Sequence, residues 1–196
     1  MANHARGGPL GAGRGSFDLI DPERVFSELH LRTGDVFFDL GCGRGQYAIT
    51  AAEMVGDKGL ILAMDLWEDG ISSLLQEAAA RGLRNIRALV SDISKRTPVE
   101  QETVDVCFMA TVFHDLVLTK MAEGGLQEVV RVLKPAGLLA VLEFKKVEGP
   151  PGPPLASRLA PEEVERIVGQ FGLEKEKLVE VGLYNYLLIF SFRGPK

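Results

Sequence analysis

A chain of 196 residues is long enough for one domain with a hydrophobic core and short for two. Its composition, 46% hydrophobic and 25% charged, is that of an ordinary globular protein, and no apolar run approaches the roughly 20 residues that a membrane-spanning helix needs. The net charge of −5 argues against a nucleic-acid partner, because nucleic-acid-binding domains usually present a clustered excess of Lys and Arg to the phosphates.

The chain is expected to divide into a flexible tail, residues 1–16, and one folded domain, residues 17–196. The tail combines glycines with basic residues and lacks the apolar stretch of a secretory signal. The two cysteines, Cys42 and Cys107, are too few for a disulfide framework, so a cytoplasmic location is the expectation.

Beyond the tail, a helix is expected to start at Pro22, with Asp21 as its N-cap. Short apolar runs then alternate with helical patterns, which predicts a doubly wound α/β sandwich with a parallel sheet covered on both faces. The expected strands are "DVFFDL", "GLILAMD", "NIRALVSD", "TVDVCFMAT" and "GLLAVLEF". The expected helices are "GQYAITAAEMV", "EDGISSLLQEAAARG" and, as one long helix, "HDLVLTKMAEGGLQEVVRVLK".

The C-terminal part of the chain departs from this alternation. Pro161, followed by Glu162 and Glu163, predicts the start of another helix. Two strand-like runs then lie on either side of Gly182 in "KLVEVGLYNYLLIFSF". A tight hairpin at this point would add an antiparallel strand to the sheet.

A strand, a glycine turn and a helix follow one another in "VFFDLGCGRGQYAIT". The dinucleotide fingerprint G-x-G-x-x-G is missed, because Gly41, Gly43 and Gly45 are followed by Gln46 where the third glycine of that pattern would fall. A phosphate-binding P-loop is excluded as well, since no Lys-Ser or Lys-Thr pair follows the glycines. The loop therefore offers backbone amides at a helix N-terminus, which suit a carboxylate as well as a phosphate.

Three acidic residues stand at or beside the ends of successive predicted strands. Asp39, beside the glycine loop, would repel a pyrophosphate and attract an ammonium group. Asp65 lies about 20 residues past the glycines, from where a carboxylate can accept hydrogen bonds from two ribose hydroxyls. Asp92 is placed to meet an adenine amino group, with Ile93 covering the ring. All three are expected at the carboxyl edge of the sheet, where open α/β sheets bind ligands.

These motifs, together with "VDVCFMATVFHDL" and "LKPAGLLAVLEF", resemble in order and spacing those of class I S-adenosylmethionine-dependent methyltransferases. The small-molecule branch that includes the ubiquinone and menaquinone biosynthesis enzymes is the most similar. The resemblance covers about residues 17–196 and implies a Rossmann-like three-layer sandwich. Its sheet would have seven strands, mostly parallel, with an antiparallel C-terminal strand.

The resemblance also implies S-adenosyl-L-methionine as the cofactor and assigns residues to it. The glycine loop and Asp39 would hold the methionine end, Asp65 the ribose, Asp92 and Ile93 the adenine, and the backbone of Ala110 the methionine ammonium. Cys42 is expected to be a small filler residue of the loop. The full set of expected cofactor residues is Asp39, Gly41, Cys42, Gly43, Gly45, Asp65, Leu66, Asp92, Ile93 and Ala110.

The catalytic candidate is His114, in the segment "ATVFHDL" that follows the fourth strand. It has two interpretations: a base that acts on the methyl acceptor, or a residue that only opens the next helix. Asp115 would raise the pKa of its imidazole if the two side chains came close. The proline-rich segment "GPPGPPLASRLAPEE" is similarly open between a plain linker and a wall of the acceptor site.

The function that the resemblance implies is methyl transfer to a small-molecule acceptor by a monomer or homodimer, with no nucleic-acid or membrane partner. Two alternatives stay open: a protein that binds S-adenosylmethionine without catalysis, and a nicotinamide-nucleotide oxidoreductase. No metal is expected, because the three histidines are scattered and no cysteine pair accompanies them.

Overall fold

A computed structural model of the chain describes residues 15–192. The predicted tail, residues 1–16, therefore lies outside the described residues except for its last two positions, Gly15 and Ser16. The division into a tail and one domain stays a prediction.

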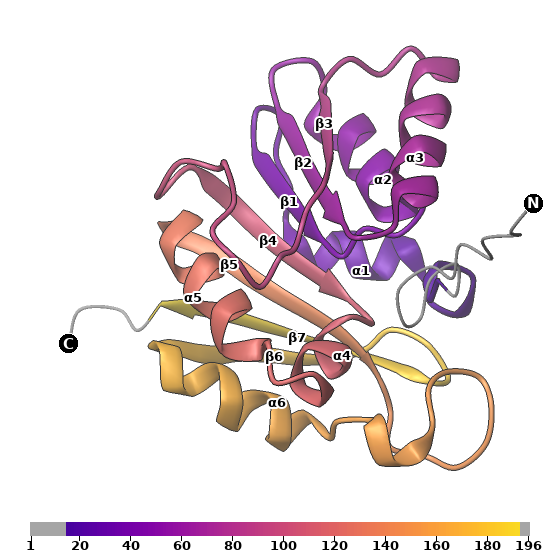
Figure 1. The fold of residues 1–196 in the computed structure, drawn as a ribbon, viewed down its shortest axis with the longest axis vertical. Coiled ribbons are helices and arrows are strands. Elements are labelled where there is room, and N and C mark those ends of the chain that lie inside the picture. The colour runs from indigo at the N-terminus through magenta and orange to yellow at the C-terminus, as the bar shows by residue number, and fades with distance from the viewer. Residues whose placement is uncertain (1–14, 193–196) are drawn as a thin grey trace, which may run out of the picture.

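A single seven-stranded sheet runs through the middle of the molecule (Figure 1). Its strand order is β3-β2-β1-β4-β5-β7-β6; β1 to β5 pair in parallel, and β7 pairs antiparallel with both of its neighbours. The predicted fold class and C-terminal hairpin are thus confirmed. The strands are β1 (Val36–Leu40), β2 (Leu60–Asp65), β3 (Ile86–Val90), β4 (Val104–Ala110), β5 (Leu133–Phe144), β6 (Leu173–Glu180) and β7 (Asn185–Phe192).

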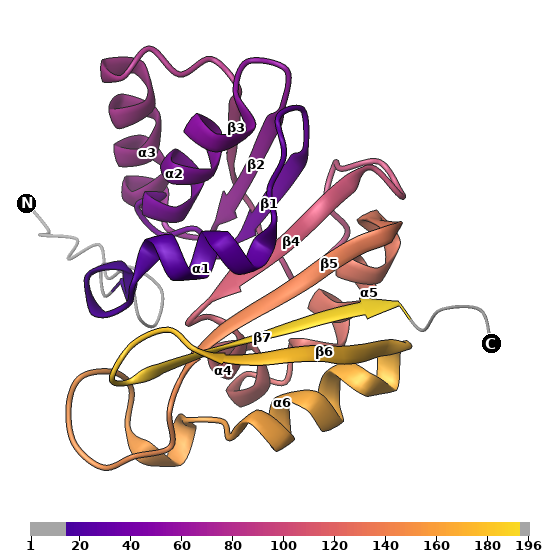
Figure 2. The same ribbon diagram turned by 180° about the vertical axis from the view of Figure 1, so that it is seen from behind.

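Helices cover the sheet on both faces, as Figure 1 and the reverse view in Figure 2 show. One face carries α1 (Pro22–Leu29), α2 (Gln46–Val55) and α3 (Glu68–Ala80); the other carries α4 (Phe113–Leu118), α5 (Ala122–Val132) and α6 (Pro161–Val168). The first helix begins as the sequence predicts, with the side chain of Asp21 accepting a hydrogen bond from the backbone N–H of Arg24.

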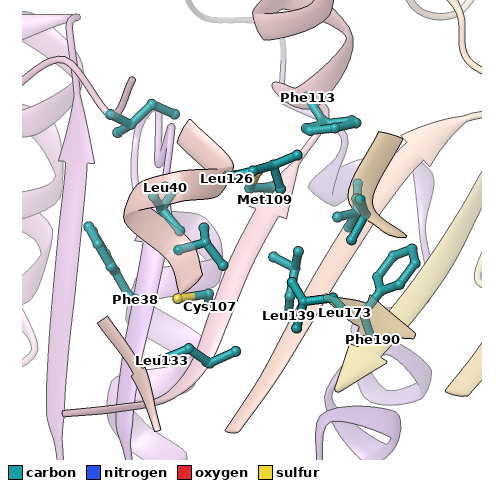
Figure 3. Close-up of a cluster of buried hydrophobic side chains, with 14 of the residues drawn as sticks. Phe38, Leu40, Cys107, Met109, Phe113, Leu126, Leu133, Leu139, Leu173 and Phe190 are labelled. Carbon is teal, nitrogen blue, oxygen red and sulfur yellow. The ribbon is translucent and has the colours of Figure 1, made fainter. Parts of the chain in front are cut away.

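Alternate residues of each central strand supply the two halves of the core. In β1, Phe38 and Leu40 point to the face of the sheet that carries α4, α5 and α6, whereas Phe37 points to the face that carries α1, α2 and α3. Figure 3 shows the first of these clusters, with Cys107 of β4 and Leu139 of β5 pointing into it. Because both faces of the central strands are buried, these strands read in the sequence as continuous apolar runs.

The edge strands are the exception to burial on both faces. At the β3 edge, the side chains of Leu89 and Val90 are exposed. At the opposite edge, most of β6 is exposed. An edge strand has a neighbour on only one side, which leaves it more open to solvent than the strands between.

The prediction of a single long helix after β4 is wrong. The structure breaks it into α4 and α5 at Lys120, whose φ of 61° lies in the left-handed region that ends a helix. The restart allows Gly124 to pack against the backbone carbonyl of Ser94, closer than any side chain would permit. The apolar residues of α4 and α5 keep a helical spacing across the break, so the sequence pattern does not reveal the change of direction.

One arginine organises the proline-rich segment that follows β5. Arg158 is 2% exposed, and its guanidinium donates five hydrogen bonds, all to backbone carbonyl oxygens. The accepting residues are Lys145, Val147, Gly149, Pro151 and Pro153. The segment is therefore an ordered loop that wraps around the buried side chain of Arg158.

Replacing this arginine should destabilise the protein. Arg158→Met removes five hydrogen bonds to part-buried carbonyl oxygens, so we expect the free energy of unfolding to fall by about 3 kcal/mol. Arg166→Met, at an exposed position of α6, is the matched control and should change stability by less than about 0.5 kcal/mol. Urea denaturation of the two variants measures the difference, and equal midpoints would contradict a structural role for Arg158.

Candidate functional site

A cavity of about 630 Å³ opens at the carboxyl edge of the sheet, where the loops after β1, β2, β3 and β4 converge. Eight of the residues predicted for the cofactor line it: Gly41, Cys42, Gly43, Asp65, Leu66, Asp92, Ile93 and Ala110. Asp39, Gly45 and His114 are not on its lining. The sequence thus predicts most of one wall of the cavity, whereas three of the predicted residues lie outside the lining.

The glycines of the loop serve different purposes. A Cβ on Gly41 would lie 2.7 Å from the side chain of Val112, and one on Gly45 would overlap Leu74, so packing alone excludes a side chain at both positions. A Cβ on Gly43, whose φ is 54°, would have no described atom within 4 Å beyond its chain neighbours. The backbone of Gly43 is therefore open to close approach by a ligand from the cavity.

Asp65 ties the glycine loop to the end of β2. Its Oδ2 accepts a hydrogen bond of 2.8 Å from the backbone N–H of Gly43, and its Oδ1 accepts one of 2.8 Å from that of Trp67. Each carboxylate oxygen still has a second lone pair, so the side chain can also accept two hydroxyl donors from the cavity. The structural and the ligand-binding interpretations of Asp65 are compatible.

Asp92 is held in place by its own turn. Its Oδ1 accepts hydrogen bonds from the backbone N–H and the hydroxyl of Ser94, and Lys95 lies 3.1 Å from Oδ2. The hydrogen bond from the Ser94 hydroxyl is the main reason that the pKa of Asp92 is lowered, against the opposing effect of partial burial. The side chain is therefore a fixed anion beside Ile93, which is 6% exposed.

Asp39 is fully buried beneath the glycine loop. Neither of its carboxylate oxygens has a hydrogen-bond partner among the described residues. Burial, and after it the charge of Asp65, raises the pKa of Asp39 from 3.8 to about 8. A buried acid without a partner is costly, and such groups are retained mainly where a ligand or reaction uses them.

His114 is not on the lining of the cavity, where a base that acts directly on the methyl acceptor would be expected. The side chain is 5% exposed, and its Nδ1 lies 2.8 Å from Oε2 of Glu143 on β5. On the other side of the ring, Nε2 lies 3.6 Å from Oδ1 of Asp115, and it is Asp115 that lines the cavity. The reason is helical phase: α4 turns His114 toward the sheet and Asp115 toward the edge.

The ionisation of His114 follows from these neighbours. Burial alone would lower the pKa of His114, but the hydrogen bond and charge of Glu143, with the charge of Asp115, raise it above its ordinary value. The predicted effect of Asp115 on this imidazole therefore holds. A direct catalytic role for His114 stays a prediction.

The N-terminal segment supplies part of the lining of the cavity. Gly15, Ser16 and Asp18 line the cavity, and the hydroxyl of Ser16 is 2.9 Å from that of Tyr47 in the first turn of α2. Phe17 packs edge-on against the same ring, with centroids 5.0 Å apart. Ser16 and Tyr47 lie 31 positions apart in the chain. The apolar residues from Phe17 onward are the one feature of the sequence that indicates a buried contact for this segment.

Cys42 lines the cavity but is unsuited to nucleophilic chemistry. It is 7% exposed, and burial, followed by the charges of Asp39 and Asp65, raises the pKa of its thiol. Across residues 15–192, no group of three His, Cys, Asp or Glu side chains is placed to hold a metal ion. Within the same residues, no helix has the length and hydropathy needed to cross a membrane.

Comparison with known proteins now decides the family. Residues 37–137, just over half of the chain, match the family described as "Methyltransferase domain". A solved S-adenosylmethionine-dependent methyltransferase from Aquifex aeolicus superposes with a TM-score of 0.81 at 34% identity, covering 89% of this chain and 91% of that one. The chain belongs to the class I S-adenosylmethionine-dependent methyltransferases.

Curated members of the family resemble the chain over part of its length. A demethylmenaquinone methyltransferase of Lactobacillus johnsonii is 26% identical over 65% of this chain and 51% of its own. The ubiquinone/menaquinone biosynthesis C-methyltransferase UbiE of Azotobacter vinelandii is 30% identical over 59% of this chain and 45% of its own. The chain thus spans about half the length of these two relatives.

The fold itself is shared more widely. The structure of the [4+2]-cyclase SpnF superposes with a TM-score of 0.71 at 19% identity, covering 88% of this chain and 80% of that one. At that identity the likeness concerns the fold alone. The same sheet and helices therefore carry more than one named activity, so the reaction has to be argued from the site.

The residues of the cavity fit the cofactor of this family. S-adenosylmethionine carries a carboxylate, an ammonium, a ribose diol and an adenine. The open space at the Cα of Gly43 lets the amino-acid end come close to the loop, the unpartnered Asp39 lies behind the loop, where an ammonium would favour its ionised form, and Asp65 has free lone pairs for the diol. Asp92 and Ile93 remain for the adenine.

The unpartnered acid predicts an unusual dependence of stability on pH. Because the pKa of Asp39 is raised to about 8 in the folded protein, the folded state keeps a proton that the unfolded chain has released. Its contribution to stability is fully present below about pH 4 and is lost as the pH rises toward about 8. Asp39→Asn removes this dependence, so its free energy of unfolding should exceed that of wild type by on the order of 2–5 kcal/mol at pH 8, and by little near pH 4.

Thermal or urea unfolding between pH 4 and 8 measures this difference. Asp57→Asn, at an exposed position, is the matched control and should follow the wild-type curve. Parallel curves for Asp39→Asn and wild type would show that the carboxyl is satisfied in solution.

Proposed function

We propose that the protein transfers a methyl group from S-adenosylmethionine to a small-molecule acceptor. The observation that carries this proposal is the cavity lining, in which an open glycine loop, Asp65 and Asp92 come together at one edge of the sheet. Each of them offers the hydrogen-bonding character that one part of the cofactor requires. Membership of the methyltransferase family supports the same reaction.

The sulfonium of the cofactor supplies a methyl group that is already electrophilic. The residues of the chain then have to hold the donor, align the acceptor and keep water out, an effect of proximity that contributes several kcal/mol. Thr111, Val112 and Leu116 line the cavity at the start of α4, next to Ala110 at the end of β4. We infer that the acceptor enters on this side, since the opposite side carries the residues assigned to ribose and adenine.

The lining also bears on the class of acceptor. Among residues 15–192, the charged side chains that line the cavity are Asp18, Asp65, Asp92, Asp115 and one cation, Arg44, whose guanidinium lies 5.4 Å from the centre of the Trp67 ring. An excess of carboxylates disfavours anionic acceptors, and with them a nucleic-acid backbone. A neutral acceptor fits this charge, and one relative of the chain is named for demethylmenaquinone. The oligomeric state is proposed to be monomer or homodimer.

Calorimetric titration with S-adenosylmethionine, S-adenosylhomocysteine and NADH tests the proposal. We expect the first two to bind and NADH not to bind, because Asp39 and the glycine spacing suit an amino-acid head and disfavour a pyrophosphate. Saturable NADH binding with no heat from S-adenosylhomocysteine would favour the nicotinamide alternative. Binding of the cofactor pair, followed by failure to methylate any of a panel of phenols, enols, amines and thiols, would favour the non-catalytic alternative.

Removing the Asp65 carboxylate should weaken the cofactor strongly. Asp65→Ala loses two hydrogen bonds to an ionised group, each contributing about 1.5–3 kcal/mol before solvent compensates, so we expect the S-adenosylhomocysteine dissociation constant to rise by roughly 100-fold or more. Asp69→Ala, at an exposed position in the first turn of α3, is the control and should bind as wild type does.

The same titration separates the two roles of Asp65. A loss of stability without a loss of affinity would mean that Asp65 only joins Gly43 to Trp67. Circular dichroism of the variant establishes that a loss of affinity does not reflect unfolding.

A further inference from the structure

Three ionisable side chains form a row from the interior of the sheet to the cavity. Glu143 on β5 is fully buried, His114 on α4 lies next to it, and Asp115 reaches the lining of the cavity. The imidazole lies between the two carboxylates, with Nδ1 2.8 Å from Oε2 of Glu143 and Nε2 3.6 Å from Oδ1 of Asp115. None of these contacts is needed to hold the cofactor residues described above.

The contacts define where protons sit on the imidazole. Nδ1 is within 3.0 Å of both oxygens of Glu143, and a carboxylate only accepts, so Nδ1 carries a proton. The backbone N–H of His114 donates to the same Glu143, which fixes the ring from a second direction. Nε2 is then the nitrogen that gains or loses a proton, and it faces Asp115.

The surroundings favour a proton held in this row. Burial lowers the pKa of His114, but the two carboxylates together raise it further than burial and the charge of Arg158, in the loop after β5, lower it. Tyr186 on β7 also faces Glu143, and burial followed by that charge raises the pKa of its hydroxyl, so Tyr186 stays neutral. For Asp115, burial is the main cause of a raised pKa.

We propose that Asp115 is the catalytic residue that takes a proton from the methyl acceptor, and that His114 and Glu143 are positioning residues that hold it ready. This inference rests on the proposed function and specifies its acceptor: a neutral nucleophile that gives up a proton on methylation, such as a phenol, an enol or a thiol. An acceptor that has already lost its proton would instead meet a carboxylate of like charge.

The step is balanced in atoms and charge. Asp115 accepts the proton that the acceptor loses, while a lone pair of the acceptor bonds to the methyl carbon and the carbon–sulfur bond breaks with its electron pair left on sulfur. The products are the methylated acceptor, a neutral thioether and a protonated Asp115. The side chain of Asp115 is 22% exposed, so it can return the proton to solvent before the next turnover.

The inference can be tested without an identified acceptor. S-adenosylmethionine labelled with carbon-13 at its methyl group is bound to the full chain, and the methyl chemical shift is followed by NMR as a function of pH. If Asp115 faces the methyl group, the wild-type curve has an inflection that Asp115→Asn lacks. Asp18→Asn removes another carboxylate of the same cavity and should keep that inflection.

The positioning role has its own readout in the same experiment. Glu143→Gln removes one of the two carboxylates that stabilise the imidazolium. The loss of imidazolium charge raises the pKa of Asp115 and the loss of the Glu143 charge lowers it, so the inflection should move away from its wild-type midpoint. A merely structural role for Glu143 would change the melting temperature and leave the midpoint where it was.

The outcomes separate this inference from the proposed function. Identical curves for Asp115→Asn and wild type, or an inflection removed by Asp18→Asn instead, would overturn the role of Asp115 while the cofactor still binds. Absence of any bound methyl signal in wild type would refute the proposed function itself, and the inference with it.

Discussion

The site depends on one reversal in the order of the strands. From β1 the chain builds outward to β2 and β3 on one side, then returns to place β4 on the other side of β1 and builds outward to β5. The loops after β1 and β4 therefore diverge to opposite faces of the sheet and leave a space between them. The two loops nevertheless touch at one point, where the backbone of Gly41 packs directly on the side chain of Val112.

The parts of the site that follow from local motifs could be predicted from the sequence. Gly41, Gly43, Asp65 and Asp92 stand directly at the ends of apolar runs, and parallel strands bring all such ends to one edge, so their meeting needs no knowledge of distant contacts. The order of elements could be predicted because the central strands, buried on both faces, read as continuous apolar runs. The antiparallel hairpin could be predicted because Gly182 separates two strand-like runs.

The parts that depend on the exact phase or path of the backbone could not be predicted. Whether His114 or Asp115 faces the cavity is decided by the turn at Thr111, whose φ of 54° is rare for a residue with a side chain. A sequence pattern of six helical residues is too short to fix that phase. Ser16 fell in the predicted tail because its partner, Tyr47, lies 31 residues away, and no local pattern encodes a single long-range hydrogen bond.

The loop centred on Arg158 has a consequence for how this protein can change over evolution. The guanidinium binds only carbonyl oxygens, which every amino acid provides, so it places no demand on the side chains of residues 145–157. The prolines suit this arrangement, since they lack an N–H and leave their carbonyls free to accept. The sequence of the loop can thus drift while its path is kept, except at Gly149 and Gly152, whose φ values of 87° and 102° disfavour a side chain.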